Sequence, residues 1–296
     1  LVEKIGERVT KEELGGSEVH GSNGVIDDIA ENEAEAMEMA KTFLSFMPSS
    51  IYNLPKQAIS KDNSSRKDEF LLSIIPKNKR ESYDILPIIK SVVDKNSFFE
   101  LGKKYGLSVI SGLARLDGFP VIVLANNPQV YGGGWTTNSC KKVIKTLDLA
   151  QVFHFPVLNF VDNPGFIIGK NAEKDGTIKY GAKALAAMYQ FKNPMCSIIL
   201  RKVFGVAGAA HTNHMNFKFR FAWPSADTGS LPFEGGIEAA YKSEISQSKD
   251  PEKFIKDKYV KLNLYTSPFR TAEKFLLENV IDPRDTRKEA CIWIKL

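Results

Sequence analysis

Cysteine is scarce in this chain of 296 residues, which contains only Cys140, Cys196 and Cys291. Their number is odd, and no two of them have the C-x-x-C spacing of metal-binding or redox sites. This pattern argues against a disulfide framework and favours three reduced thiols in a reducing compartment.

Long hydrophobic runs are also missing. No apolar stretch approaches the ~20 residues that a transmembrane helix needs, so no membrane span is expected. The first residues, LVEKIGERVTKEELGG, carry acidic side chains early and contain no apolar segment, so a secretory signal and a secreted location are not expected. The stretch begins without methionine, and we expect it to be part of a longer protein.

The chain lacks a strong charge of either sign. Its net charge is +5, spread along the sequence, with no basic stripe of the kind that binds nucleic acid. A mild positive balance is compatible with an anionic small substrate. We therefore expect no nucleic acid partner.

The short motifs of several enzyme classes are absent. The sequence contains no G-x-S-x-G nucleophile motif, no G-x-G-x-x-G dinucleotide motif, no phosphate-binding G-x-x-x-x-G-K-[ST] loop and no H-E-x-x-H. His211 and His214 have a spacing that could place them on one helix face, but no carboxylate or cysteine lies near enough in sequence to complete a site. No metal is expected.

An internal repeat is present instead. FPVIVLANNP at 119–128 and FPVLNFVDNP at 155–164 share a Phe-Pro, an aliphatic run and an Asn-Pro, and NPMCSIILRKVFG follows from Asn193. Short apolar runs without alternation are typical of strands buried on both faces. Helices are predicted between them, at Ser139–Gln151 with Ser139 as its cap and at Ile178–Lys192. The repeat predicts right-handed crossovers in an open, layered α/β structure.

The ends of the chain have a different pattern. Asn32 is expected to cap a helix with Glu35 as its capping-box partner, Ser267-Pro268 to begin another helix and Asp285 to cap the last one. The region after Pro48 is rich in proline, serine and mixed charge, with a short helix expected near Phe70. We divide the chain into an N-terminal segment, a linker and a larger C-terminal domain, at residues 1–47, 48–82 and 83–296.

The turns that follow the three repeated strands are the expected place for a site, because ligands bind at the carboxyl ends of parallel strands. The turn in RKVFGVAGAAH, residues 201–211, is made of small residues. Gly205 would allow the chain to bend, and Ala207, Gly208 and Ala209 would open a helix. Free backbone N–H groups there could form an oxyanion hole. The alternative is close helix–strand packing, and this stretch alone favours the alternative.

In combination, several motifs resemble the carboxyltransferase (β) subunits of biotin-dependent acyl-CoA carboxylases, such as propionyl-CoA and methylcrotonyl-CoA carboxylases. The similar stretches, in chain order, are EELGGSEVHGSNGVIDDIAENEAEA, VDNPGFIIG, IKYGAKALAA, RKVFG, AWPSAD, SPFRTAEKF and VIDPRDTR. The resemblance implies a crotonase-like spiral of strand–turn–helix units. It also implies that the chain is the end of an N-terminal half followed by a complete C-terminal half.

The reaction that the resemblance implies is transfer of CO₂ from carboxybiotin, on a partner biotin carrier or biotin carboxylase subunit, to the α carbon of a short acyl-CoA. In such a reaction, backbone N–H groups stabilise the developing oxyanions. By resemblance, the catalytic backbone is Gly205, Val206, Ala207 and Gly208. Gly165 and Phe166 would receive biotin, and Ala209 would lie near the acyl pocket.

Further consequences follow from the same resemblance. The site would form between subunits of a homo-oligomer in the cytoplasm or mitochondrial matrix, and this stretch alone would be inactive. Val206 departs from the family, which usually has glycine or alanine at that position, and WTTN at 135–138 replaces acidic residues. Two alternatives stay open: a component of a biotin-dependent decarboxylase, and a non-catalytic assembly or CoA-binding relative.

Overall fold

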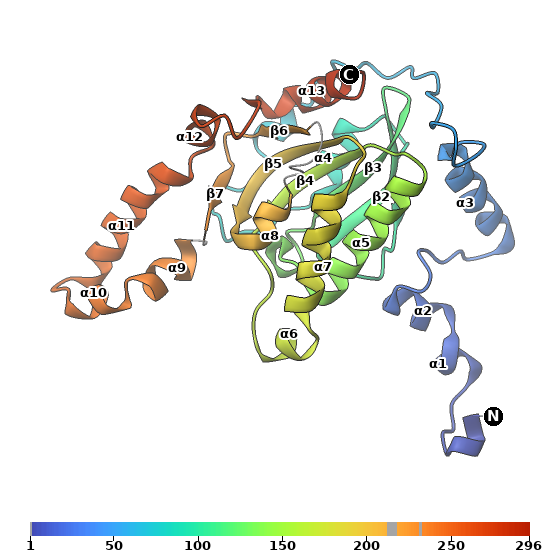
Figure 1. Cartoon of the computed structure of the whole chain (residues 1–296), viewed down its shortest axis with the longest axis horizontal. Helices are drawn as coiled ribbons and strands as arrows, with labels where there is room; N and C mark the ends of the chain where they lie inside the picture. The colour runs from blue at the N-terminus through green and yellow to red at the C-terminus, as the bar shows by residue number, and fades with distance from the viewer. Residues whose placement is uncertain (1, 212–217, 231–232) are drawn as a thin grey trace.

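One mixed β-sheet organises the chain (Figure 1). The computed structural model describes residues 2–211, 218–230 and 233–296. In spatial order the strands are β1 (Phe99–Leu101), β2 (Val109–Leu116), β3 (Phe119–Asn126), β4 (Val157–Asn163), β5 (Met195–Phe204), β6 (Lys218–Ala222) and β8 (Asn279–Val280), while β7 (Asp227–Gly229) pairs with the end of β5.

The three repeated apolar runs form β3, β4 and β5, which are adjacent and parallel. This confirms the strand–helix–strand prediction. Every residue of β4 is buried, as expected for a strand covered on both faces. Strand β2 was not anticipated, because it lies outside the repeated pattern that marks β3, β4 and β5. It joins β3 through a hairpin turn at Asp117 and Gly118, both with positive φ.

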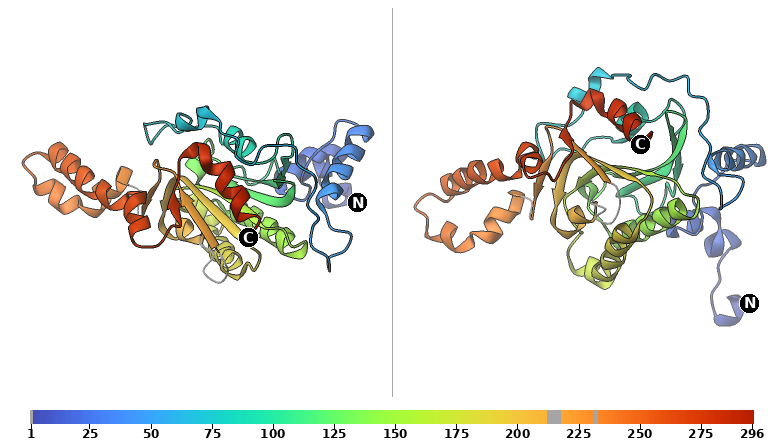
Figure 2. Two further views of the ribbon diagram at one scale, coloured as in Figure 1. Left: turned by 90° about the horizontal axis from the view of Figure 1, so that it is seen from above. Right: turned by 45° about the horizontal axis from the view of Figure 1, so that its top comes forward.

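Helices cover both faces of the sheet (Figure 2). Two long crossover helices, α5 and α7, pack with alternate strand residues in one core, and α4 and α13 pack in a second core on the opposite face. The helices are α1 (Lys11–Gly15), α2 (Ser17–Asn23), α3 (Glu33–Phe46), α4 (Leu86–Val92), α5 (Thr137–Val152), α6 (Lys170–Lys174), α7 (Thr177–Gln190), α8 (Gly205–Ala210), α9 (Phe233–Ala240), α10 (Lys242–Gln247), α11 (Pro251–Thr266), α12 (Pro268–Glu273) and α13 (Thr286–Trp293).

Helix α5 begins two residues before its predicted start. Thr136 is the cap, and its hydroxyl accepts a hydrogen bond from the Ser139 N–H at 3.1 Å. The prediction that Ser139 is the cap was therefore wrong. Its side chain instead lies buried and hydrogen bonds to Ser108. Thr136 was missed because it is further from the first apolar position of the helix.

The other predicted helix ends are mostly confirmed. Asn32 caps α3 by accepting the N–H of Glu35, but the Glu35 carboxylate accepts the N–H of Glu31 instead of completing a capping box. Helix α12 begins at Pro268, and Asp285 stands at the cap position of α13 without a side-chain capping bond.

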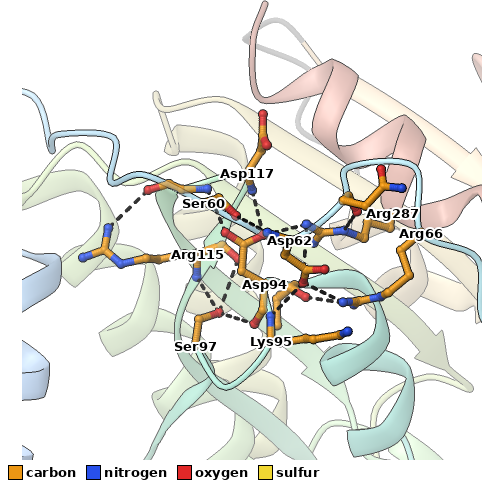
Figure 3. Close-up of polar contacts among 12 residues, drawn as sticks. Ser60, Asp62, Arg66, Asp94, Lys95, Ser97, Arg115, Asp117 and Arg287 are labelled. Carbon is orange, nitrogen blue, oxygen red and sulfur yellow. Dashed lines mark hydrogen bonds and ion pairs between the residues drawn. The ribbon is translucent and has the colours of Figure 1, made fainter.

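The segment 48–82 is irregular apart from a short 3-10 helix at Glu69–Leu72, as expected near Phe70. It is anchored to the sheet domain by a cluster of charged residues (Figure 3). Arg287 of α13 donates to the Asn63 carbonyl at 2.8 Å and to Asp94 at 2.7 Å. Arg66 pairs with Asp62 and donates to the Ser91 carbonyl. Because these groups are largely buried, they fix the course of the segment.

Helices α9 to α12 form an arm that extends from the sheet beside β7 (Figure 1). The chain returns from this arm to the sheet edge at β8, which pairs with β6. Among the helices of the described residues, none combines the length and the apolar character required to span a membrane.

Candidate active site

The turn after β3 is held against the end of β4. The Asn126 side chain donates to the Gly133 carbonyl at 3.0 Å and accepts the N–H of Asp162 at 3.2 Å. Gly133 has a φ of +87°, and a Cβ there would stand 2.2 Å from the Asp162 carbonyl oxygen. Only glycine allows the two backbones to approach so closely.

The turns after β3 and β4 also pair directly through backbone hydrogen bonds. Trp135 donates its N–H to the Gly165 carbonyl at 3.0 Å, and Ile167 donates to the Trp135 carbonyl at 2.9 Å. The rings of Trp135 and Phe166 meet edge to face, with centroids 6.0 Å apart. Trp135, noted from the sequence only as part of the WTTN departure, therefore connects the two turns.

Gly165 and Phe166 differ in what they offer to a ligand. Gly165 has a φ of +130°, and no atom of the described residues lies within 4 Å of the position that a Cβ would occupy. Its N–H is held by Asn163 Oδ1 at 2.9 Å. The Phe166 ring is packed over Gly181, where a Cβ would clash at 2.8 Å. The ring anchors the turn, and the space beside the Cα of Gly165 stays open.

The turn after β5 has the arrangement expected from its small residues. Gly205 bends the chain with a φ of +62°, and α8 begins at once. The first N–H groups of a helix have no intrahelical acceptor, and within the part of the chain that the structure describes no side chain caps this helix. Val206 is 60% exposed and Ala209, one turn later, is also exposed, so both side chains point outward.

Close packing is present in the same helix. Ala207 and Gly208 are buried, and a Cβ on Gly208 would stand 2.8 Å from the backbone of Val203. The small residues therefore have the packing role considered from the sequence, because they let α8 lie against β5. The oxyanion-hole role stays a prediction.

A buried ion pair supports the ends of β4 and β5. Arg201 donates to Asp162 at 3.0 Å, and the same carboxylate accepts the Tyr83 hydroxyl at 2.9 Å and the N–H of Lys202 at 3.0 Å. Burial raises the pKa of the Asp162 carboxyl, and the positive charge of Arg201 is the strongest effect opposing it. Asp162 directly precedes the Asn-Pro-Gly-Phe turn, so the pair fixes where that turn begins.

His211 follows α8 and is 2% exposed. Its two ring nitrogens contact Asn159 at 3.1 Å and Asn163 at 2.9 Å, and its ring packs against Trp135 at 4.9 Å. Burial, with a smaller effect of the charged Arg220, lowers its pKa to about 3. The imidazole is therefore neutral near pH 7, and both nitrogens are occupied.

A metal site is not found in the part of the chain that the structure describes, because no group of three histidine, cysteine or acidic side chains converges there. His211 is committed to two asparagines. His214, its partner in the H-x-x-H spacing, lies outside the described residues.

Two cavities flank the turns after β3 and β4. One of about 760 Å³ is lined by Lys104, Lys141 and Tyr131, among others. The other, of about 550 Å³, shares Tyr131 with it and extends along residues 167–172. Gly205 to Ala209 do not line either of these two cavities.

Several residues of this region were not assigned a role in the site from the sequence: Trp135, Asp162, Asn163, Arg201 and His211. Part of the signal was present, because the Asn-Pro repeat places an asparagine at the end of β4. Their contacts join residues that are far apart in the chain, so the pairing itself required the fold.

The whole chain, residues 1–296, matches the carboxyl transferase domain family. The propionyl-CoA carboxylase beta chain of Cereibacter sphaeroides is 32% identical over 284 residues, covering 95% of this chain and 55% of that protein. The methylmalonyl-CoA decarboxylase subunit alpha of Veillonella parvula is 31% identical over 284 residues, with coverages of 95% and 54%.

A solved structure has the same fold. The transcarboxylase 12S hexamer, with methylmalonyl-coenzyme A and methylmalonic acid bound, superposes with a TM-score of 0.92 at 28% identity, covering 99% of this chain and 57% of that one. This confirms the expected crotonase-like architecture. The chain spans about half the length of the curated relatives it matches. It belongs to the carboxyl transferase domain family.

Proposed function

We propose that the protein containing this chain is the carboxyltransferase component of a biotin-dependent acyl-CoA carboxylase. The chain would supply the end of the N-terminal half and the C-terminal half of the subunit, divided as 1–47, 48–82 and 83–296. Membership of the carboxyl transferase domain family over all 296 residues supports this role. The transcarboxylase 12S relative was solved with methylmalonyl-coenzyme A, which supports an acyl-CoA as substrate class.

The observation that carries the proposal is the meeting of three glycine-bearing turns at one edge of parallel strands. Gly133, Gly165 and Gly205 all have positive φ, and the first two turns are joined by backbone hydrogen bonds. N–H groups that stay free on a framework held rigidly in this way can stabilise an oxyanion without rearranging during the reaction.

Carboxybiotin would supply both the CO₂ and, after releasing it, the basic nitrogen that removes the α-proton of the acyl-CoA. The chain's own residues would then only bind the substrates and stabilise the negative charge that develops on them. The N–H groups of Val206 and Ala207, at the uncapped start of α8, would donate hydrogen bonds to the biotin ureido oxygen. The turn at Gly165 and Phe166, which is open beside the Cα of Gly165, would receive the biotin ring.

His211 does not compete for the role of base. Both its nitrogens are hydrogen bonded, and burial lowers its pKa to about 3, so it has little basicity at neutral pH. Ala209 shares the outward face of α8 with Val206 and would border the acyl group. The two cavities beside Tyr131 have the size of small-molecule sites.

The proposal includes partners. A biotin carrier and a biotin carboxylase subunit would deliver the carboxyl group, and the subunit would form a homo-oligomer with its site between copies, as the hexameric relative suggests. The three cysteines are free and buried, which suits the reducing cytoplasm or mitochondrial matrix.

The test is carboxyl transfer by the purified full-length protein, with free biotin and a panel of malonyl-type CoA esters. We expect CoA-dependent carboxylation of biotin with at least one short acyl chain. No transfer with any member of the panel would refute the enzymatic role and favour a non-catalytic relative.

The decarboxylase alternative is favoured by one observation, since the Veillonella parvula subunit matches about as well as the carboxylase chains. Both systems would transfer carboxyl groups in the assay above. Co-purification separates them, because a carboxylase would retain a biotin carboxylase subunit that hydrolyses ATP, and a decarboxylase would not.

A further inference from the structure

His211 makes polar contacts with two neighbouring strands. Its ring contacts Asn159 and Asn163 of β4, and its carbonyl accepts a hydrogen bond from the Ser197 hydroxyl of β5 at 2.9 Å. Its N–H donates to the Gly208 carbonyl at the end of α8. A buried imidazole with all of its polar groups engaged is a rigid connection between α8 and the sheet.

The contacts determine which nitrogen carries the proton. Asn163 uses its amide oxygen to accept the Gly165 N–H, so its amide nitrogen is the group that faces His211. Nε2 must then accept, and in a neutral ring Nδ1 carries the hydrogen. Among the described residues, the Asn159 amide oxygen has no partner. Rotating that amide by 180° brings the oxygen to Nδ1 and gives up the hydrogen bond of the amide nitrogen to the Ser197 hydroxyl.

These contacts close a circuit through all three turns. His211 accepts from Asn163, Asn163 accepts from Gly165, and the Gly165 carbonyl accepts the N–H of Trp135. The ring centroids of Trp135 and His211 lie 4.9 Å apart, and this contact completes the circuit. A shift of α8 would therefore move the Gly165 turn, and a shift of Gly165 would move Trp135.

We propose that His211 is a positioning residue for carboxyl transfer, holding the N–H groups at the start of α8 in register with the backbone of Gly165 and Phe166. This inference rests on the proposed function, in which those two backbone segments contact the same biotin. The bond that transmits the position is the one from Asn163 to Nε2, because Asn163 also holds the Gly165 N–H.

Two substitutions of the full-length protein separate the two ring nitrogens. In His211→Gln the longer amide reaches the place of Nε2 and can accept from Asn163. In His211→Asn the shorter amide reaches only the place of Nδ1 and keeps the contact with Asn159. Both variants replace the ring by an amide, so they lose similar packing against Trp135, and each is a control for the other.

Carboxyl transfer is the first readout. We expect H211N to lower kcat by roughly 10- to 100-fold, because small misplacements of catalytic groups have effects of this size. KM for the acyl-CoA should change little, and H211Q should stay much closer to the wild type. The melting temperatures of the two variants, measured alongside, show whether stability differs between them.

Hydrogen exchange followed by mass spectrometry is the second readout and does not depend on activity. Peptides containing Gly165 and Ile167 should exchange about tenfold faster in H211N than in H211Q, while peptides from α13 should exchange alike in both. Equal exchange at Gly165 and equal kcat in the two variants would overturn the proposal. A wild-type protein without transfer activity would refute the proposed function, and the exchange comparison would still decide whether His211 couples the turns.

Discussion

The Asp162 carboxylate and the Arg201 guanidinium form an ion pair at 3.0 Å between the ends of β4 and β5, with side-chain exposures of 0% and 3%. Arg201 also donates to the Glu81 carbonyl, and its guanidinium lies 4.8 Å from the centre of the Tyr83 ring. The pair joins the two strands whose following turns carry the predicted site residues. This buried ion pair therefore helps to fix the positions of the two turns.

Removing one partner of this pair should destabilise the protein strongly. We expect Asp162→Asn to lower the free energy of unfolding by about 3–5 kcal/mol, because Arg201 would keep a buried charge without its counterion. Urea denaturation measures the loss. The double variant D162N/R201M removes both charges and should lose less than D162N alone. If the double variant loses more than D162N, desolvation of Arg201 is not the cause.

Arg287 and Arg284 allow a buried arginine near the C-terminus to be compared with a partly exposed one. Arg287 is 1% exposed and bonds to Asn63, Val92 and Asp94, whereas the Arg284 side chain is 30% exposed in its pair with Asp282. We expect Arg287→Gln to reduce the free energy of unfolding by about 3–5 kcal/mol. Arg284→Gln should have a much smaller effect, since solvent screens exposed pairs.

The location of the effect can be checked as well. Limited proteolysis should cut R287Q within residues 48–82 sooner than the wild type, because Arg287 anchors that segment through the Asn63 carbonyl. Unchanged proteolysis in that segment would contradict the anchoring role.

The strands of the central repeat could be predicted from the sequence, because each contains a short apolar run without the alternation of a half-exposed strand. These strands are Phe119–Asn126, Val157–Asn163 and Met195–Phe204. Strands β1, β7 and β8 have two or three residues each, which is too few to produce a pattern. They form because neighbouring strands offer backbone partners.

The candidate site was predictable only in part. Gly165 and Gly205 could be identified as turn residues, since they follow apolar strands and have the positive φ that glycine favours. The contact of His211 with Asn163 could not, because it spans 48 positions in the chain and no sequence pattern links the two residues. Such side-chain contacts depend on strand register, which the apolar pattern does not specify.

Alanine substitutions at Gly132 and Gly133 test the close approach of the turn after β3 to the end of β4. Both have positive φ, so alanine at either position should cost roughly 1–2 kcal/mol of backbone strain. At Gly132 the nearest atom to a Cβ is 4.0 Å away, whereas at Gly133 the Asp162 carbonyl is only 2.2 Å away. We expect Gly133→Ala to be the more destabilising by a further ~1–3 kcal/mol, as for overpacked cores.

Activity gives a second comparison for the same pair of glycines. Displacing Asp162 would also move the turn at Gly165, so Gly133→Ala should lower kcat for carboxyl transfer while Gly132→Ala retains it. Equal stability and equal activity of the two variants would contradict the close approach.

Substitutions of Val206 test whether the N–H groups at the start of α8 donate hydrogen bonds to an oxyanion during the reaction. Val206→Gly keeps the N–H, and since the side chain is 60% exposed we expect carboxyl transfer to persist. Val206→Pro removes the N–H at a position in the first helical turn, where proline is tolerated. We expect it to lower kcat by about 10²–10³-fold, as for the loss of one oxyanion-hole donor.

The pair of Val206 variants also separates the catalytic role from a structural one. Circular dichroism and melting temperature should show that V206P remains folded. If V206P retains activity, the N–H of Val206 is not a donor in the reaction. If V206G is more active than the wild type, the valine side chain hinders the site.

Stability should fall at acidic pH because of His211. Burial and the charge of Arg220 lower its folded-state pKa to about 3, below the unfolded value near 6.5. Between these two values the unfolded chain binds a proton that the folded protein does not, so the free energy of unfolding decreases as the pH falls. The slope from one such group is at most about 1.4 kcal/mol per pH unit.

The variant H211Q tests this expectation because it has no titrating ring. Urea denaturation from pH 7 to pH 4 should show that the free energy of unfolding declines less steeply for H211Q than for the wild type. Parallel declines would mean that His211 is protonated in the folded protein over this range, which its contacts with two asparagines oppose.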